Sequence, residues 1–111
     1  MWVPGHIICL MATEESVGYY QALQASARPR TYLCGDAPDV PAERWYFEAV
    51  EDGGEVIVIR QLVIEGDGTR HAYSADHIED AWGFLTDQPL DGSEGLSACR
   101  AEEFHAAWNS A

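Results

Sequence analysis

Imidazole and carboxylate side chains gather in a short stretch after residue 70, and such groups could hold a metal ion. The stretch contains His71, Asp76, His77, Glu79 and Asp80. Imidazole nitrogen and carboxylate oxygen are both ligands of zinc and related ions. The spacing is poor, because there is no HExxH motif and His77 and Asp80 share a face only in a helix. We therefore predict no metal site, and His71, His77 and Asp80 remain the alternative ligand set.

Groups that could act as nucleophiles are not placed for catalysis. Cys99 and His105 lie six residues apart near the C-terminus, on nearly opposite faces of a helix. No serine stands in a G-x-S-x-G setting, and neither a GxGxxG nor a phosphate-binding loop occurs. We predict no catalytic residues and no cofactor. The sequence therefore favours a binding protein over an enzyme.

The three cysteines, Cys9, Cys34 and Cys99, are odd in number and widely spaced, with no CxxC or CxxH pair. This pattern is typical of reduced thiols in a cytoplasmic protein. The apolar run from Ile7 to Met11 has no basic segment before it and is far too short to span a bilayer. We therefore expect a cytoplasmic location.

The charge of the chain is strongly one-sided. Its 111 residues include 19 acids and 6 bases, all of them arginine, which gives a net charge of -13. This excess excludes nucleic acids and anionic membranes as partners, because both require a basic face. A basic protein partner is compatible with it. An apolar content of 47% and an aromatic content of 11% predict a folded chain despite the charge.

The first third of the chain predicts a strand, a helix and a second strand. Residues 6–11 form a short apolar run, and a helix over about 13–27 begins at Thr13, followed by two acids. Arg28-Pro29-Arg30 ends this helix, and residues 31–34 return as a strand. The segment 35–43 contains glycine, two prolines and two aspartates, and is the best candidate for a joint.

Residues 44–74 predict a three-stranded antiparallel meander, because two short glycine-containing turns separate β-prone runs. Arg60-Gln61 interrupts the longest run. The pair is a candidate β-bulge, and the arginine is expected to pair with an acid such as Glu48 or Asp80.

The segment 76–94 contains six acids and no base, yet also apolar and aromatic residues. We expect an ordered loop that covers the sheet. A final helix over about 100–109 is predicted, with Phe104 and Trp108 on one face. The whole chain, 1–111, is therefore predicted to be a single acidic α+β domain with four to five antiparallel strands.

A set of motifs from Tyr46 onward resembles a loose group of small bacterial proteins, some of them similar to the immunity proteins that sit beside secreted toxins. The motifs cover about the last 63 residues and read Tyr46-Phe47-Glu48, Arg60-Gln61, Asp76-His77-x-Glu79-Asp80, Asp87-Gln88-Pro89-Leu90-Asp91 and Glu103-Phe104-x-x-x-Trp108. The resemblance implies an inhibitor that covers a basic partner and implies no catalytic residues. With the charge, it predicts a partner-binding surface formed by Asp76, Glu79, Asp80, Trp82, Phe84, Asp87 and Asp91.

Two alternatives remain open. The strand–helix–strand opening resembles the glyoxalase-type βαβββ modules, which implies a small metal-dependent or ligand-binding enzyme built from paired copies. A homodimer formed through an exposed strand edge or an aromatic patch is the other.

Overall fold

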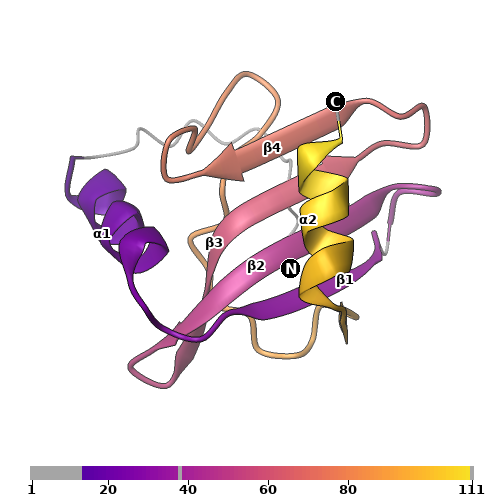
Figure 1. Ribbon diagram of the computed structural model, residues 1–111. Helices are drawn as coiled ribbons and strands as arrows, with labels where there is room; N and C mark the ends of the chain where they lie inside the picture. Colours follow the sequence, from indigo (N-terminus) through magenta and orange to yellow (C-terminus); the bar gives the residue numbers. More distant parts are fainter. Residues whose placement is uncertain (1–13, 38, 111) are drawn as a thin grey trace.

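Short turns and one longer loop organise the centre of the chain into consecutive antiparallel strands. The computed structural model describes residues 14–37 and 39–110. Its elements are α1 (Glu14–Ala25), β1 (Thr31–Asp36), β2 (Arg44–Asp52), β3 (Glu55–Ile64), β4 (Arg70–Ser74), β5 (Ser97–Ala98) and α2 (Ala101–Asn109). The five strands form one antiparallel sheet in the order β4-β3-β2-β1-β5 (Figure 1). The predicted α+β fold with a central meander and two flanking helices is confirmed.

Two details of the sheet differ from the prediction. The fifth strand is Ser97–Ala98, which pairs with β1, whereas the predicted strand at 6–11 lies outside the described residues. The register of β2 and β3 shifts between Glu48, opposite Arg60, and Ala49, opposite Val58. The extra residue is therefore Ile59, and the bulge lies one position before the predicted Arg60-Gln61 pair. The predicted joint at 35–43 covers the end of β1 and the loop to β2, in which the Ala37 amide donates to the Glu43 carbonyl at 2.9 Å.

One face of the sheet carries the main core. Alternate residues of the strands, including Trp45 and Phe47, are buried there because the pleat sends them to the same side. The segment 75–96 has no regular helix or long strand, but it lies against this core, and Leu85 and Leu90 are buried in it. The prediction of an ordered loop that covers the sheet is confirmed. The core side chains are Tyr20, Leu23, Trp45, Phe47, Val50, Ile57, Val58, Ile59, Val63, Tyr73, Leu85 and Leu90.

Helix α2 lies across the opposite face of the sheet, while α1 sits at one end of the strands (Figure 1). Phe104 of α2 is fully buried, and its ring lies 5.3 Å from the ring of Tyr32 on β1 and 5.7 Å from that of Trp108. This is the anchor expected from the spacing of Phe104 and Trp108. In the described part of the chain, neither helix is long and apolar enough to cross a membrane.

The C-terminal carbonyls of each helix accept hydrogen bonds from an arginine outside that helix: Arg30, in the loop after α1, and Arg70, on β4. The last four carbonyls of a helix have no partner within it. In α1, Arg30 donates to the carbonyls of Leu23, Gln24 and Ser26 at 3.2, 2.7 and 3.0 Å. In α2, Arg70 of β4 donates to the Ala107 carbonyl. Each guanidinium also places positive charge at the negative end of a helix dipole.

Candidate functional site

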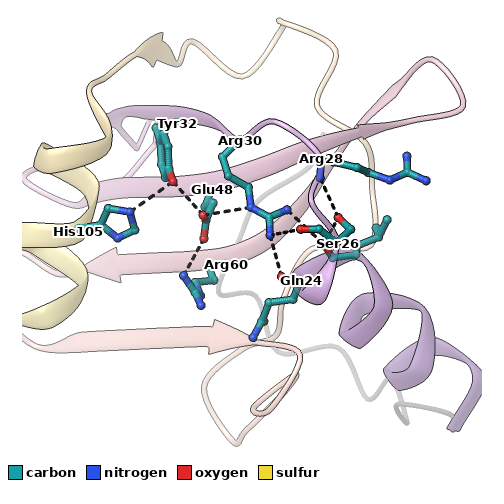
Figure 2. A network of polar contacts seen from close by, with 9 residues as sticks. Gln24, Ser26, Arg28, Arg30, Tyr32, Glu48, Arg60 and His105 are labelled. Atoms are coloured by element: carbon teal, nitrogen blue, oxygen red, sulfur yellow. Dashed lines mark hydrogen bonds and ion pairs between the residues drawn. The ribbon is translucent and has the colours of Figure 1, made fainter.

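A buried carboxylate lies at the centre of the sheet face that α2 covers (Figure 2). Glu48 is only 3% exposed, and it stands opposite Arg60 of β3 and Tyr32 of β1 in the strand register. Its Oε1 is 2.9 Å from Arg60 Nη1, and its Oε2 is 3.0 Å from the Tyr32 hydroxyl and 3.7 Å from Arg30 Nε. The ion pair predicted for Arg60 is therefore confirmed, with Glu48 as the acid.

The network extends from Glu48 to α2 through Tyr32. Because the Tyr32 hydroxyl has one hydrogen and donates it to Glu48, it accepts from His105 Nε2 at 3.3 Å. Burial, and then the hydrogen bond to Glu48, raise the pKa of Tyr32, so the phenol keeps its proton. The Arg60 guanidinium also lies over the Trp108 ring, 5.6 Å from its centre. These contacts tie α2 to the sheet.

Asp80 organises the acidic segment 76–94. Its Oδ1 accepts from the Tyr73 hydroxyl at 2.9 Å and from the Trp82 and Gly83 amides at 2.9 and 3.0 Å, and its Oδ2 is 3.2 Å from His77 Nε2. Burial raises the pKa of Asp80, but the hydrogen bonds outweigh it and lower the pKa to about 2. Asp80 is exposed and shapes the loop by accepting these hydrogen bonds.

The two aromatic residues proposed for partner contact lie in different environments. Trp82 is half-buried, and its ring stacks on His71 with centroids 3.6 Å apart and planes 5° apart. Phe84 is 9% exposed and packed inside, and its carbonyl accepts from the Gln61 amide at 3.0 Å. Phe84 therefore offers little exposed surface to a partner, because its side chain is buried. Of the predicted acidic contact residues, Glu79 is half-buried, and four are exposed: Asp76, Asp80, Asp87 and Asp91.

The alternative metal ligands predicted from the sequence are not brought together. His71 Nε2 is 2.8 Å from Glu65 Oε2, whereas His77 pairs with Asp80. Within residues 14–37 and 39–110, the ligand atoms of His71, His77 and Asp80 do not all lie within 4.8 Å of one another. The two histidines are instead paired with different carboxylates, His71 with Glu65 and His77 with Asp80.

A different set of ligand atoms does converge. The Cys34 and Cys99 sulfurs and a Glu103 carboxylate oxygen all lie within 4.8 Å of one another. Arg44 Nη2 is also 3.3 Å from Cys34 Sγ. Burial, then the neighbouring Cys34 and Glu103, raise the pKa of Cys99 to about 12. The wide separation of the two cysteines in sequence gave no sign of this contact, because it depends on the pairing of β5 with β1.

Most of the arginines are paired within the chain, whereas the acids of one segment have no lysine or arginine in that segment. Five of the six arginines contact other groups of the chain: backbone carbonyls, the carboxylates of Asp36, Glu48 and Asp52, or the Cys34 sulfur. The segment 76–94 holds six acids and no base to balance them. The exposed charge of this segment is therefore negative throughout.

Comparisons with models of known protein families, with curated proteins and with solved structures find no match to this chain. The resemblance of the last 63 or so residues to immunity-like bacterial proteins accordingly stays a prediction. Function must be inferred from the charge and geometry of the chain itself.

Proposed function

We propose that this chain is an acidic binding protein of the immunity or inhibitor type, which neutralises a basic protein such as a bacterial toxin by covering its surface. The observation that carries the proposal is the segregation of charge. Five arginines are engaged in contacts with other groups of the chain, while Asp76, Asp87 and Asp91 stand exposed on a segment without any lysine or arginine. A basic partner approaching this segment meets acids from a stretch that itself contains no lysine or arginine.

Negative charge at such a surface acts mainly on the rate at which the two proteins associate. A negative surface raises the association rate with a basic partner and loses that effect as salt screens it. Asp76, Asp87 and Asp91 supply the exposed charge in the proposed surface. Asp80 and Phe84 hold the loop in shape, Asp80 through its hydrogen bonds at an exposed position and Phe84 through its buried ring.

Trp82 is the proposed aromatic anchor of the surface. Tryptophan is enriched among the residues that dominate binding energy at protein interfaces. Its indole is already stacked on His71, which is itself paired with Glu65. A side chain held in this way loses little conformational freedom when a partner covers it.

The test uses the purified product of the neighbouring gene as the probe, with association followed by surface plasmon resonance at two ionic strengths. Binding to the unaltered chain is expected to be fast at low salt and markedly slower at high salt. The triple variant D76N/D87N/D91N should associate roughly tenfold more slowly, as expected for loss of steering charge. Asparagine retains the oxygen with which Asp91 accepts from the Ser93 amide at 2.9 Å.

The matched control is E51Q/E55Q/E102Q, which removes the same charge from exposed residues outside the segment 76–94. The association rate of this control should fall by clearly less than that of D76N/D87N/D91N. Equal rates for the two triple variants would contradict the proposed surface. A neighbouring product that does not bind the unaltered chain at all would contradict the proposed function.

A further inference from the structure

The pairing of β5 with β1 creates a corner of the molecule where two thiols meet a carboxylate. Cys34 stands opposite Ser97, and Leu33 opposite Ala98, so that Cys99 continues the register and its amide donates to the Tyr32 carbonyl at 2.9 Å. Since alternate positions of a strand face one side, Cys34 and Cys99 share the face on which α2 lies. Helix α2 begins at Ala101, which places Glu103 in its first turn.

We propose that Cys34, Cys99 and Glu103 form a binding site for a thiophilic divalent ion of the Zn²⁺ class. Their three ligand atoms already lie within 4.8 Å of one another. In a tetrahedral zinc site with Zn–S bonds of about 2.3 Å, two sulfurs are about 3.8 Å apart. Small side-chain rotations therefore suffice to close the three atoms around one ion.

The donor set selects the kind of metal. Thiolate sulfur is a soft ligand that favours zinc-like ions over Mg²⁺ and Ca²⁺, which prefer oxygen. Three protein ligands leave the fourth tetrahedral position to water. Cys34 is buried, Cys99 is half-buried and Glu103 is exposed, so an ion can enter from the solvent side.

Arg44 balances the charge of the proposed site. Two thiolates, one carboxylate and one divalent cation together carry a single negative charge. The guanidinium of Arg44, with Nη2 3.3 Å from Cys34 Sγ, offsets that charge and supplies a hydrogen bond to the ligand sulfur. The site lies on the face covered by α2, whereas the segment 76–94 covers the other face. The proposal therefore stands independently of the partner surface.

The test is titration of the full, reduced and metal-free chain with Co²⁺, which gives strong sulfur-to-metal absorption when bound by thiolates. One Co²⁺ per chain is expected, displaced by one Zn²⁺. C34S and C99S should each abolish the absorption, and E103Q should weaken binding. E102Q is the matched control, since it alters the neighbouring exposed carboxylate and should bind as the parent does. Arg44→Met should weaken binding by about 10- to 100-fold.

The titration of the parent chain decides the proposal even if a cysteine variant fails to fold. Absence of Co²⁺ absorption from the reduced parent would overturn it, as would absorption that persists in both C34S and C99S. Glu103 is exposed, so its substitution leaves the fold intact, and equal affinities of E103Q and E102Q would remove the carboxylate from the site.

Discussion

Replacing Glu48 with glutamine should destabilise the folded chain by about 2–3 kcal/mol. Removing one partner of a buried ion pair costs about 3–5 kcal/mol, because the other charge is left without compensation. Here the side chains of Arg60 and Arg30 are 29% and 22% exposed, so water offsets part of that cost. Arg30 also keeps its three bonds to the carbonyls of α1. The expected loss therefore lies below the range for a fully buried pair.

Urea unfolding followed by tryptophan fluorescence measures this loss directly. The midpoint should fall while the slope with denaturant stays unchanged, since the same surface is exposed on unfolding. For a chain of this length, a loss of 2–3 kcal/mol corresponds to a fall of roughly 10 °C in Tm. Glu51→Gln is the control, because it makes the same change on the same strand at an exposed position and should shift stability by less than about 0.5 kcal/mol.

A double-mutant cycle separates the ion pair from other effects of the substitution. If Glu48 and Arg60 stabilise each other, E48Q/R60M should be less destabilised than the sum of E48Q and R60M. A Glu48→Gln chain within about 0.5 kcal/mol of the parent would refute the assignment of Glu48 as the electrostatic centre of the α2 face.

Two further substitutions test the contacts that hold the segment 76–94. Gln61→Leu should cost about 2–4 kcal/mol in urea unfolding, because the Phe84 carbonyl and the Thr86 amide, at 3.0 and 2.9 Å from the Gln61 side chain, lose their partner; a loss under about 1 kcal/mol would contradict this role. Asp80→Asn should flatten the acid dependence of stability. The pKa of Asp80 is lowered from 3.8 to about 2 in the folded chain, so its contribution is present above pH 3.8 and is lost as pH falls toward 2. Unfolding free energies measured from pH 5 to pH 2 should fall more steeply for the parent than for D80N, and Asp76→Asn, at an exposed position, should follow the parent.

The parts of the fold that the sequence predicts are those with strong local signals. The strands of the meander were predictable because short glycine-containing turns separate runs of β-prone residues. The Glu48–Arg60 pair was predictable as well, since a charged side chain inside a buried strand requires an opposite charge. The bulge lies at Ile59, one residue before the predicted Arg60-Gln61 pair. A run of apolar residues does not indicate at which position the strand carries its extra residue.

The parts that the sequence could not predict depend on contacts distant in the chain. Strand β5 has two residues, Ser97 and Ala98, both exposed, so it carries no hydrophobic alternation. Its pairing with β1, and hence the meeting of the thiols, follows only from the assembled sheet. Phe84 was predicted as a contact residue because it is an aromatic residue within the acidic segment, and its burial could not be read from the sequence, since it depends on how that segment packs on the sheet.

The use of arginine links the fold to the proposed function. A guanidinium offers five donors in a fixed plane, which lets Arg30 bind three carbonyls and lie beside Glu48. A lysine ammonium could not reach this set in one geometry, and the chain contains no lysine. Because most of its cations are engaged in this way, the acids at the surface repel one another and weaken the folded state. Added salt therefore acts in opposite directions: it relieves this repulsion in the free chain, and it removes the attraction that draws a basic partner to Asp76, Asp87 and Asp91.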